Sequence, residues 1–354
     1  MKVLFVFYIP SGGMETLNRQ RCSALRQRGI MAECLYYEPG AGLQNPVDFP
    51  VHVTRDDEQT RRLLQEGQYD VIVVTTDHSS FERFRSLGFQ GKLVLEIQGY
   101  GPMEVARAEL TKAIPVVQAH ASALLNPNTP HIARLFNELY PTIPKFHINN
   151  CFDSASFAYY AASKPDTPIV AWIGRIEDNK NWREFLYIGY RLLLEYPQLR
   201  LWMFEDASLS VPAEREQFEQ LMLGLGLGPR LELRSNIPNA QMAYYYSQIG
   251  DSGGMMCSTS KVEGAPLSVL EALSCRCPVL ASNSDGVTAS VIHNITGKRY
   301  MLGDIEQAVR GAKELMNNAD HREQIRDAGL KHLQQEFSAE KYCMEFMKML
   351  HVIG

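Results

Sequence analysis

Short apolar runs alternate with amphipathic helical patterns along the whole chain. Residues 3–8 are continuously apolar, as expected for a parallel strand that is covered on both faces. A loop at residues 10–13 follows, and a helical pattern extends from about residue 15 to residue 28. Further strands are predicted at residues 32–37, 71–75, 92–97 and 114–118. This alternation is typical of a doubly wound α/β domain.

The alternation starts again after a polar segment at residues 162–168, which contains two prolines and favours a linker. Strands are predicted at residues 169–173, 199–204, 231–234, 254–257 and 279–281, and helices at 182–195, 267–273 and 305–317. We therefore expect two Rossmann-like α/β domains, at residues 1–163 and 164–337. Open α/β sheets bind ligands beyond the carboxyl ends of their strands, so two such sheets joined by a linker predict a shared cleft.

Composition narrows the class of protein. A chain of 354 residues with 45% hydrophobic and 21% charged residues is long enough for two ordinary globular domains. The net charge of −5 argues against a general nucleic-acid-binding protein. The seven cysteines are scattered, and Cys275 and Cys277 have no second pair to complete a zinc site. Buried reduced thiols, and hence a reducing cytoplasm, are the expectation.

Membrane insertion is not predicted. The apolar residues 1–9 stop at Pro10, too soon to span a bilayer. Contact with the inner face of a membrane stays open, because Arg19, Arg21, Arg26 and Arg28 on the first predicted helix could touch anionic lipid. A solvated helix face is the favoured interpretation of these arginines, since the whole chain is acidic.

The most informative stretch follows the predicted strand at residues 254–257. Gly264, Ala265 and Pro266 form a turn, and a helix begins at about Leu267. Backbone N–H groups at a helix start, together with the helix dipole, favour an anion. The sequence therefore predicts a phosphate site at residues 264–267.

Two acids flank this site. Glu263 lies just before the turn and is expected to point at the group that the anion carries. Glu271 lies one turn into the helix, where a carboxylate can accept hydrogen bonds from ribose hydroxyls. The combination of Glu-Gly-x-Pro, Glu-Ala and Pro-Val at the next strand resembles the family 4 retaining glycosyltransferases of the GT-B fold, which carry a Glu-x7-Glu signature.

Two glycine segments fit this resemblance. Gly174, Arg175 and Lys180 follow the first strand of the second domain and resemble the family's Gly-Arg…Lys segment, whose cations hold the donor diphosphate. Fixed positive charges stabilise a leaving diphosphate as it gains negative charge; the alternative is a solvated surface pair. Gly12 and Gly13 resemble the family's glycine loop, which approaches the donor from across the cleft, although a tight turn explains two glycines equally well.

The resemblance covers nearly the whole chain. It implies that a final helix at residues 338–354 packs back on the first domain. Three departures are Gln98, where the family often has histidine, Cys151 in place of a glycine, and Arg276 in place of a glycine before Pro278. A glutamine can hydrogen-bond a sugar hydroxyl but cannot act as a base.

The resemblance implies a retaining transferase that moves a hexose from a nucleotide-diphosphate sugar, with UDP expected, to an unidentified acceptor. Glu263 would bind hydroxyls of the donor sugar, Arg175 and Lys180 the diphosphate, and Glu271 the ribose. The implied front-face route needs no metal and no cofactor. We expect no nucleic-acid partner.

The acceptor stays open among polysaccharide, lipid-linked glycan, protein and small molecule. Asp77, His78, Gln98 and His120 are acceptor-side candidates, because each is predicted to follow a strand of the first domain. Polar residues at the rim of the sheet are the alternative interpretation. Two other functions keep the nucleotide contacts: a nucleotide-sugar epimerase and a non-catalytic nucleotide-sugar or glycan-binding protein.

Overall fold

The computed structural model describes residues 1–161, 164–206 and 210–354. The chain forms two compact units: unit 1 comprises Met1–Asp153 with Glu336–Gly354, and unit 2 comprises Ser154–Gln335. The division after Asp153 precedes the predicted boundary between residues 163 and 164. Residues 162 and 163 of the predicted linker lie outside the described residues. The last helix, α12 (Ala339–Ile353), is part of unit 1.

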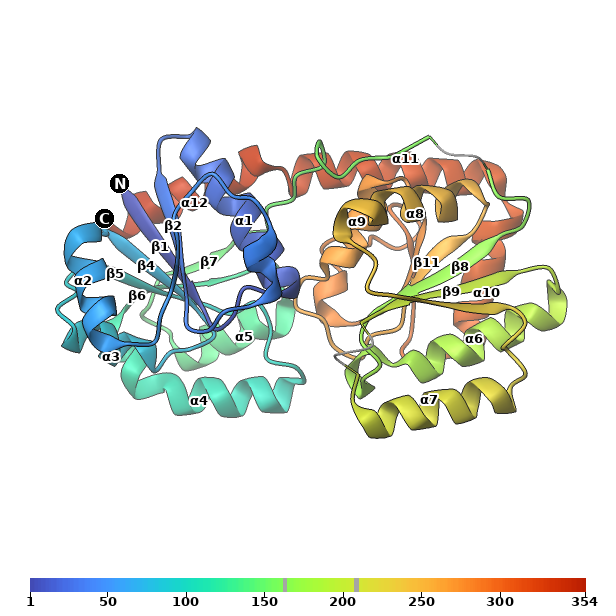
Figure 1. Ribbon diagram of the computed structural model, residues 1–354, viewed down its shortest axis with the longest axis horizontal. Coiled ribbons are helices and arrows are strands. Elements are labelled where there is room, and N and C mark those ends of the chain that lie inside the picture. Colours follow the sequence, from blue (N-terminus) through green and yellow to red (C-terminus); the bar gives the residue numbers. More distant parts are fainter. Residues whose placement is uncertain (162–163, 207–209) are drawn as a thin grey trace. The chain divides into compact units, whose positions relative to one another are not determined.

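Unit 1 is built on a seven-stranded parallel sheet of order β3-β2-β1-β4-β5-β6-β7 (Figure 1). The order reverses between β1 and β4, as in doubly wound sheets. The strands are β1 (Lys2–Phe7), β2 (Met31–Tyr36), β3 (Val51–Val53), β4 (Val71–Thr75), β5 (Lys92–Glu96), β6 (Ala121–Asn126) and β7 (Lys145–His147).

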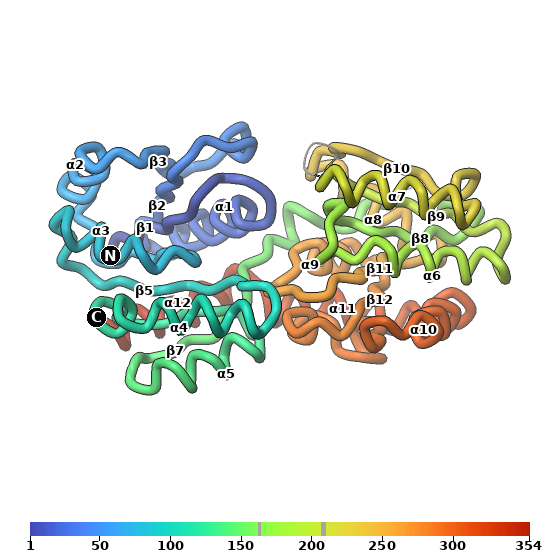
Figure 2. Tube along the Cα trace, turned by 90° about the horizontal axis from the view of Figure 1, so that it is seen from below, coloured from blue at the N-terminus to red at the C-terminus, as the bar shows by residue number. Residues whose placement is uncertain are grey.

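Helices cover both faces of this sheet, so successive strand side chains enter two separate cores (Figure 2). On one face Leu4 and Ile72 pack with helices α2 to α5, and on the other Phe5 and Val73 pack with α1 and α12. The helices of unit 1 besides α12 are α1 (Gly12–Gln27), the 3-10 helix η1 (Ala41–Gln44), α2 (Asp57–Gly67), α3 (Ser80–Ser86), α4 (Met103–His120) and α5 (Pro130–Leu139).

One predicted strand of unit 1 is wrong. Residues 114–118 lie inside α4, and the strand, β6, begins only at Ala121. A short apolar run cannot be assigned to a strand or to a buried helix by hydrophobicity alone. The helical spacing of buried Leu110, Ala113 and Val117 decides the matter, and Pro115 is accommodated within the helix.

Unit 2 has a six-stranded parallel sheet of order β10-β9-β8-β11-β12-β13. The strands are β8 (Ile169–Ile173), β9 (Arg200–Glu205), β10 (Leu231–Ser235), β11 (Met255–Ser258), β12 (Val279–Ser282) and β13 (Lys298–Tyr300). The order reverses between β8 and β11, which makes the carboxyl ends of these two strands the expected ligand-binding edge.

Two sets of helices flank the sheet of unit 2. One core joins Trp172 and Met203 of the strands to Trp182 of α6, Phe218 of α7 and Leu315 of α10. Helices α8 and α9 pack on strands β8, β11 and β12. The helices are the 3-10 helix η2 (Asp178–Lys180), α6 (Trp182–Glu195), α7 (Pro212–Gly224), α8 (Asn239–Asp251), α9 (Leu267–Ser274), the 3-10 helix η4 (Asp285–Val287), α10 (Ile305–Asn317) and α11 (Ala319–Glu336).

The arginines of α1 do not form one solvated face. Arg21 is fully buried and makes a bidentate ion pair with Glu96, with N–O distances of 2.7 and 3.0 Å. Arg19 pairs with Glu15 on the same helix, and Arg28 with Glu340 of α12. Arg21 is therefore unavailable to a lipid surface, and the favoured interpretation of a solvated helix face does not hold for it.

The remaining compositional expectations concern cysteines and membranes. All seven cysteines are buried free thiols. Across the described ranges, no helix combines the length and apolar character needed to cross a bilayer.

Candidate functional site

The loops that follow β8 and β11 are bonded to each other. The side chain of Asn179 donates to the carbonyl of Val262 at 3.1 Å and accepts from the amide of Val262 at 3.2 Å. The amide of Lys261 donates to the carbonyl of Asn179 at 2.8 Å. The side chain of Lys261 also bonds Asp178 at 2.6 Å. These contacts fix the segment before the predicted phosphate site against the Gly-Arg…Lys segment.

Lys180 and Glu263 meet at this junction. Lys180 Nζ lies 2.6 Å from Glu263 Oε1, and both side chains are mostly shielded, with 25% and 12% of their surface exposed. The sequence analysis proposed both residues for the donor, and the structure places them in direct contact. A hydrogen-bonded cation and anion at a strand edge present both signs of charge to one ligand.

Buried polar contacts fix the backbone at Lys180. The indole of Trp172 donates to Thr259 Oγ1 at 3.0 Å, and that hydroxyl contacts the carbonyls of Lys180 and Asn181 at 2.9 Å. Asn181 takes a left-handed φ of 51°, which lets the chain turn directly into α6. The backbone that carries Lys180 is thus tied to the core of unit 2.

The turn at residues 263–266 is closed by a glycine from another loop. The amide of Gly286 donates to the carbonyl of Glu263 at 3.0 Å. A Cβ at position 286 would lie 2.0 Å from the carbonyl oxygen of Gly264, so only glycine permits this approach. Ala265 and Pro266 complete the turn, and α9 begins at Leu267 as predicted.

Glu271 is held by α8. Its Oε1 accepts from Asn239 Nδ2 at 2.9 Å, and its Oε2 accepts from the hydroxyl of Tyr246 at 3.0 Å. Burial raises the pKa of Glu271, and the two hydrogen bonds lower it by less. The carboxylate is thus oriented on the inner side of α9, and a carboxylate has lone pairs for further donors.

Arg175 and Gly174 lie at the start of the same edge. Gly174 directly follows β8, and its amide donates to the carbonyl of Phe204 at 3.0 Å. Arg175 is exposed and pairs with Glu177 at 3.1 Å. Unit 2 therefore brings Lys180 and Glu263 into contact, whereas Arg175 lies on the solvent-facing loop after β8 and pairs with Glu177.

In unit 1, Gly12 and Gly13 are not in a loop before the helix. They are the first two residues of α1, which begins earlier than the predicted residue 15. Gly12 has a left-handed φ of 56°, which allows the extended backbone at Ser11 to enter the helix. Both glycines therefore contribute to a helix N-terminus.

Asp77 and His78 follow β4 as predicted, in a strained turn. Thr76, a β-branched residue, has a φ of 72°, which such residues rarely adopt. The carboxylate of Asp77 accepts from the hydroxyls of Ser79 and Ser80, each at 2.5 Å. Both Asp77 and His78 are partly exposed at the carboxyl end of the sheet.

Gln98 follows β5 and is engaged on both sides. Its Nε2 donates to Glu96 Oε1 at 3.0 Å, and its Oε1 accepts from Asn150 Nδ2 at 2.9 Å. Glu96 also accepts from Thr75 Oγ1 at 2.6 Å and from Arg21. The amide that replaces the family's histidine is therefore the outer member of a buried polar network.

His120 does not belong to this edge. It is the last residue of α4 and immediately precedes β6, whose first residue pairs with Leu93 near the start of β5. The prediction of a strand at residues 114–118 places His120 at the carboxyl edge, but these residues lie in α4. In the structure His120 lies at the amino edge of the sheet, and it is withdrawn as an acceptor-side candidate.

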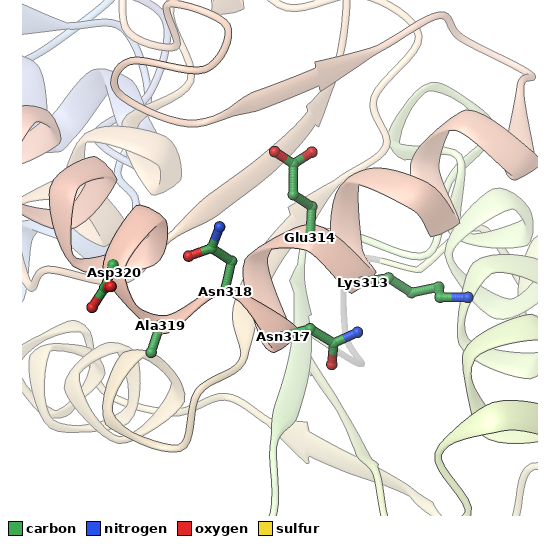
Figure 3. Close-up of a pocket in the computed structure, with 6 residues that line it drawn as sticks. All are labelled: Lys313, Glu314, Asn317, Asn318, Ala319 and Asp320. Atoms are coloured by element: carbon green, nitrogen blue, oxygen red, sulfur yellow. The ribbon is translucent and has the colours of Figure 1, made fainter.

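A surface hollow of about 520 Å³ lies where α10 meets α11, lined by Lys313, Glu314, Asn317, Asn318, Ala319 and Asp320 (Figure 3). None of the predicted site residues lines it. Lys313 pairs with Glu195, and Glu314 pairs with Lys298. These two charged side chains of the hollow are therefore already engaged in ion pairs. Elsewhere, the described residues contain no cluster of three or more His, Cys, Asp or Glu side chains arranged for a metal ion.

Sequence reasoning missed several residues that position the site: Asn179, Thr259, Asn239, Tyr246 and Gly286. Asn179 lies in the Gly-Arg…Lys segment, but the sequence does not predict the hydrogen bonds of its side chain with the backbone of Val262. Asn239 and Tyr246 lie on α8, which was not predicted, so their contact with Glu271 carried no sequence signal.

Comparison with known proteins finds a family match over most of unit 2. Residues 161–332 match the family model described as glycosyl transferases group 1. This match supports the predicted enzyme class, a glycosyltransferase.

Two curated relatives each match part of this chain. An uncharacterized glycosyltransferase of Haemophilus influenzae is 29% identical over 171 residues, which cover 47% of this chain and 46% of the relative. Sucrose synthase of Solanum tuberosum is 24% identical over 155 residues, which cover 42% of this chain and 19% of that enzyme. The matches thus span about half the length of the first relative and a smaller part of the second.

Solved structures resemble the whole chain. Anabaena HepE in complex with UDP and glucose is 18% identical, has a TM-score of 0.83, and the match covers 99% of this chain and 100% of that one. Sucrose-phosphate synthase of Thermosynechococcus elongatus is 18% identical and has a TM-score of 0.81. The match covers 100% of this chain and 99% of that one. The likeness shows that the fold is GT-B and confirms the predicted α/β class with two Rossmann-like domains.

Proposed function

We propose that the chain is a metal-independent retaining glycosyltransferase of family 4 that moves a hexose from a UDP-sugar to an acceptor. The observation that carries this proposal is the contact between Lys180 and Glu263, held beside the start of α9 at the carboxyl ends of β8 and β11. Cations, a helix start and a carboxylate at one sheet edge suit a diphosphate with a polyhydroxylated group attached.

Each residue of unit 2 then has a role. Lys180 and Arg175 bind the diphosphate, with Gly174 allowing close approach and the backbone of residues 264–267 completing the anion site. Glu263 accepts hydrogen bonds from hydroxyls of the donor sugar. Glu271, the second acid of the Glu-x7-Glu pattern, accepts hydrogen bonds from the ribose.

Chemistry in this proposal comes from positioning and charge. The bond between the anomeric carbon and the diphosphate oxygen breaks, and the sugar passes through an oxocarbenium-like state. Lys180 and Arg175 stabilise the charge that develops on the leaving diphosphate. The acceptor oxygen bonds to the anomeric carbon on the face that the diphosphate leaves, and the leaving diphosphate oxygen takes the acceptor's proton, so the anomeric configuration is retained.

The comparisons support the donor class. Structures of Anabaena HepE have been solved with UDP, with UDP and glucose, and with UDP-glucose. Their likeness to this chain is one of fold, and the Lys180–Glu263 pair supplies the chemical argument. The buried free thiols support our proposal of a reducing, cytoplasmic setting.

The test is incubation of the full chain with UDP-glucose, UDP-galactose, UDP-N-acetylglucosamine and GDP-mannose without acceptor. We expect slow release of UDP from one donor, strongly reduced in Lys180→Ala and Glu263→Gln, together with a thermal shift that grows with the logarithm of UDP concentration. Interconversion of the sugar without release would identify an epimerase. Binding without turnover would identify a nucleotide-sugar-binding protein.

A further inference from the structure

We propose that Tyr8 and Asp77 form a saccharide-binding subsite at the carboxyl edge of unit 1, and that the acceptor is therefore a carbohydrate. This inference rests on the proposed function, because it names the second substrate of the same reaction. It is carried by three observations within unit 1: a strained turn, an oriented carboxylate and an exposed aromatic ring.

The strained turn lies at Thr76. Its left-handed φ of 72° is unfavourable for a β-branched residue. Three bonds hold it: its amide donates to the carbonyl of Glu96 at 2.8 Å, and its carbonyl accepts from the Tyr100 hydroxyl at 2.7 Å and from the His78 amide at 3.1 Å. Strain that the surroundings maintain in this way is concentrated at ligand-binding sites. Here it directs the next two residues, Asp77 and His78, out of the sheet edge.

The carboxylate of Asp77 is oriented before any ligand arrives. Ser79 and Ser80 each donate a hydroxyl hydrogen bond to it at 2.5 Å, and Ser80 is itself bonded to the hydroxyl of Tyr37. An ionised carboxylate has about four lone-pair positions, so two remain for a ligand. Two hydroxyl groups on adjacent carbons of a sugar match that spacing.

The aromatic ring is that of Tyr8, which directly follows β1. Its side chain is 37% exposed. The ring packs edge-on against Phe7 and Tyr37, with centroid distances of 5.5 and 6.0 Å, so its orientation is fixed from two sides. Tyr37, which the ring contacts, is hydrogen-bonded through its hydroxyl to Ser80, and Ser80 donates to Asp77, so the ring and the carboxylate belong to one contact cluster. Burial and the charge of Asp77 raise the pKa of Tyr8, and Arg55 lowers it by less.

A fixed, exposed ring beside an oriented carboxylate matches a pyranose. Its C–H face is apolar and packs on an aromatic ring, while its hydroxyls project from the rim toward a hydrogen-bond acceptor. A lipid chain fits less well, because it would cover the Asp77 carboxylate without offering a donor.

The test is saturation-transfer difference NMR on the full chain with saturating UDP, using methyl α-D-glucopyranoside, methyl α-D-galactopyranoside and methyl α-D-mannopyranoside as probes. We expect transfer to the ring protons of at least one glycoside. Tyr8→Ala and Asp77→Asn should each lower it at least fivefold, and Tyr8→Phe should retain most of it. Tyr187→Ala is the matched control, because Tyr187 is an exposed tyrosine, 44% accessible, on α6 of unit 2.

Absence of transfer to every glycoside would overturn the inference, as would equal transfer in Tyr8→Ala and Tyr187→Ala. Sedimentation with phosphatidylglycerol vesicles that is lost in Tyr8→Ala would also overturn it and point to a lipid acceptor. Thermal shifts with UDP on the same samples separate the two proposals. UDP binding without glycoside binding would overturn only the saccharide-subsite proposal. Tyr8-dependent glycoside binding without UDP binding would overturn only the proposed transferase function.

Discussion

The hydroxyl of Tyr246 donates to Glu271 Oε2 at 3.0 Å, and the ring of the same tyrosine packs edge-on against Phe157 with a centroid distance of 6.1 Å. Phe157 belongs to the segment that enters unit 2, and its carbonyl accepts from Ser274 of α9 at 2.5 Å. The carboxylate proposed for the ribose is therefore oriented by a residue that is itself packed on both sides.

Removing the Tyr246 hydroxyl should weaken the donor site without unfolding the unit. One hydrogen bond to a charged group is worth about 1.5–3 kcal/mol, so we expect Tyr246→Phe to weaken UDP binding by about tenfold or more. Isothermal titration calorimetry with UDP measures this. Tyr244→Phe, on the exposed side of the same helix, should bind UDP as the wild type does; equal losses in both variants would contradict the role of Tyr246.

The raised pKa of Glu271 predicts a particular dependence of stability on pH. Between its ordinary pKa and its raised folded value, the folded chain keeps a proton that the unfolded chain has lost. This group's contribution to stability is therefore fully present at low pH and is lost as pH rises through the folded pKa. The Glu271→Gln variant lacks this titrating group. The melting temperature of the variant, relative to that of the wild type, should therefore rise as the pH is increased from 4 to 8. A constant difference across this range would show that Glu271 does not titrate in it.

Lys180 should matter for turnover more than for folding. Loss of one fixed charge at a developing anion costs about 10²–10³ in rate in comparable sites, so we expect Lys180→Ala to lower UDP release from the donor by that factor. Lys180→Arg should restore part of the rate. Lys313→Ala is the control, since Lys313 lies on α10 and pairs with Glu195; a comparable loss there would argue against a specific role for Lys180.

The buried pair of Arg21 and Glu96 should dominate the stability of unit 1. Removal of one partner strands a buried charge, and Arg21→Met should destabilise the chain by about 3–5 kcal/mol in chemical denaturation. The double variant Arg21→Met, Glu96→Leu should recover most of that loss, because no unpaired charge remains. Failure of the double variant to recover would mean that the wider network with Thr75 and Gln98 is the stabilising element.

The ion pair of Arg21 and Glu96 also makes the stability of the chain depend on pH under acidic conditions. Burial raises the pKa of Glu96, but the charge and hydrogen bonds of Arg21 outweigh it, and the net pKa is lowered. Stability from this carboxylate is present above its ordinary pKa and declines as pH falls toward the folded value. Arg21→Met, Glu96→Leu should therefore unfold with a weaker pH dependence below pH 5, measured by circular dichroism.

Much of this architecture could be predicted because hydrophobic periodicity reports burial directly. The runs at β4 and β8, and the helical patterns of α6 and α10, have the predicted bounds, since each is bordered by polar or turn residues. The interior run at 114–118 lacked such borders, and a helix was mistaken for a strand. That error carried His120 to the wrong edge of the sheet, because the placement of a residue after a strand depends on the strand being there.

The charged residues of the candidate site could be proposed from the sequence, but the residues that position them could not. Lys180, Glu263 and Glu271 could be proposed because the Glu-Gly-x-Pro, Glu-Ala and Gly-Arg…Lys segments together resemble a known family. The reciprocal bonds of Asn179 with the backbone of Val262 could not be foreseen, because they join segments far apart in the sequence. Backbone contacts of this kind depend on loop conformation, which hydrophobic patterns do not encode.

Helix α12 supplies Tyr342, Phe346 and Met349 to the same core as Phe5 and Leu25 of unit 1. The first 153 residues therefore cannot complete their own interior while the chain is being made. On the ribosome, the apolar side of that sheet must wait through the synthesis of the whole of unit 2 before its cover emerges. Helix α12 thus completes this core after the other elements of unit 1 have been made, so these elements reach their final stability only once α12 has been synthesised.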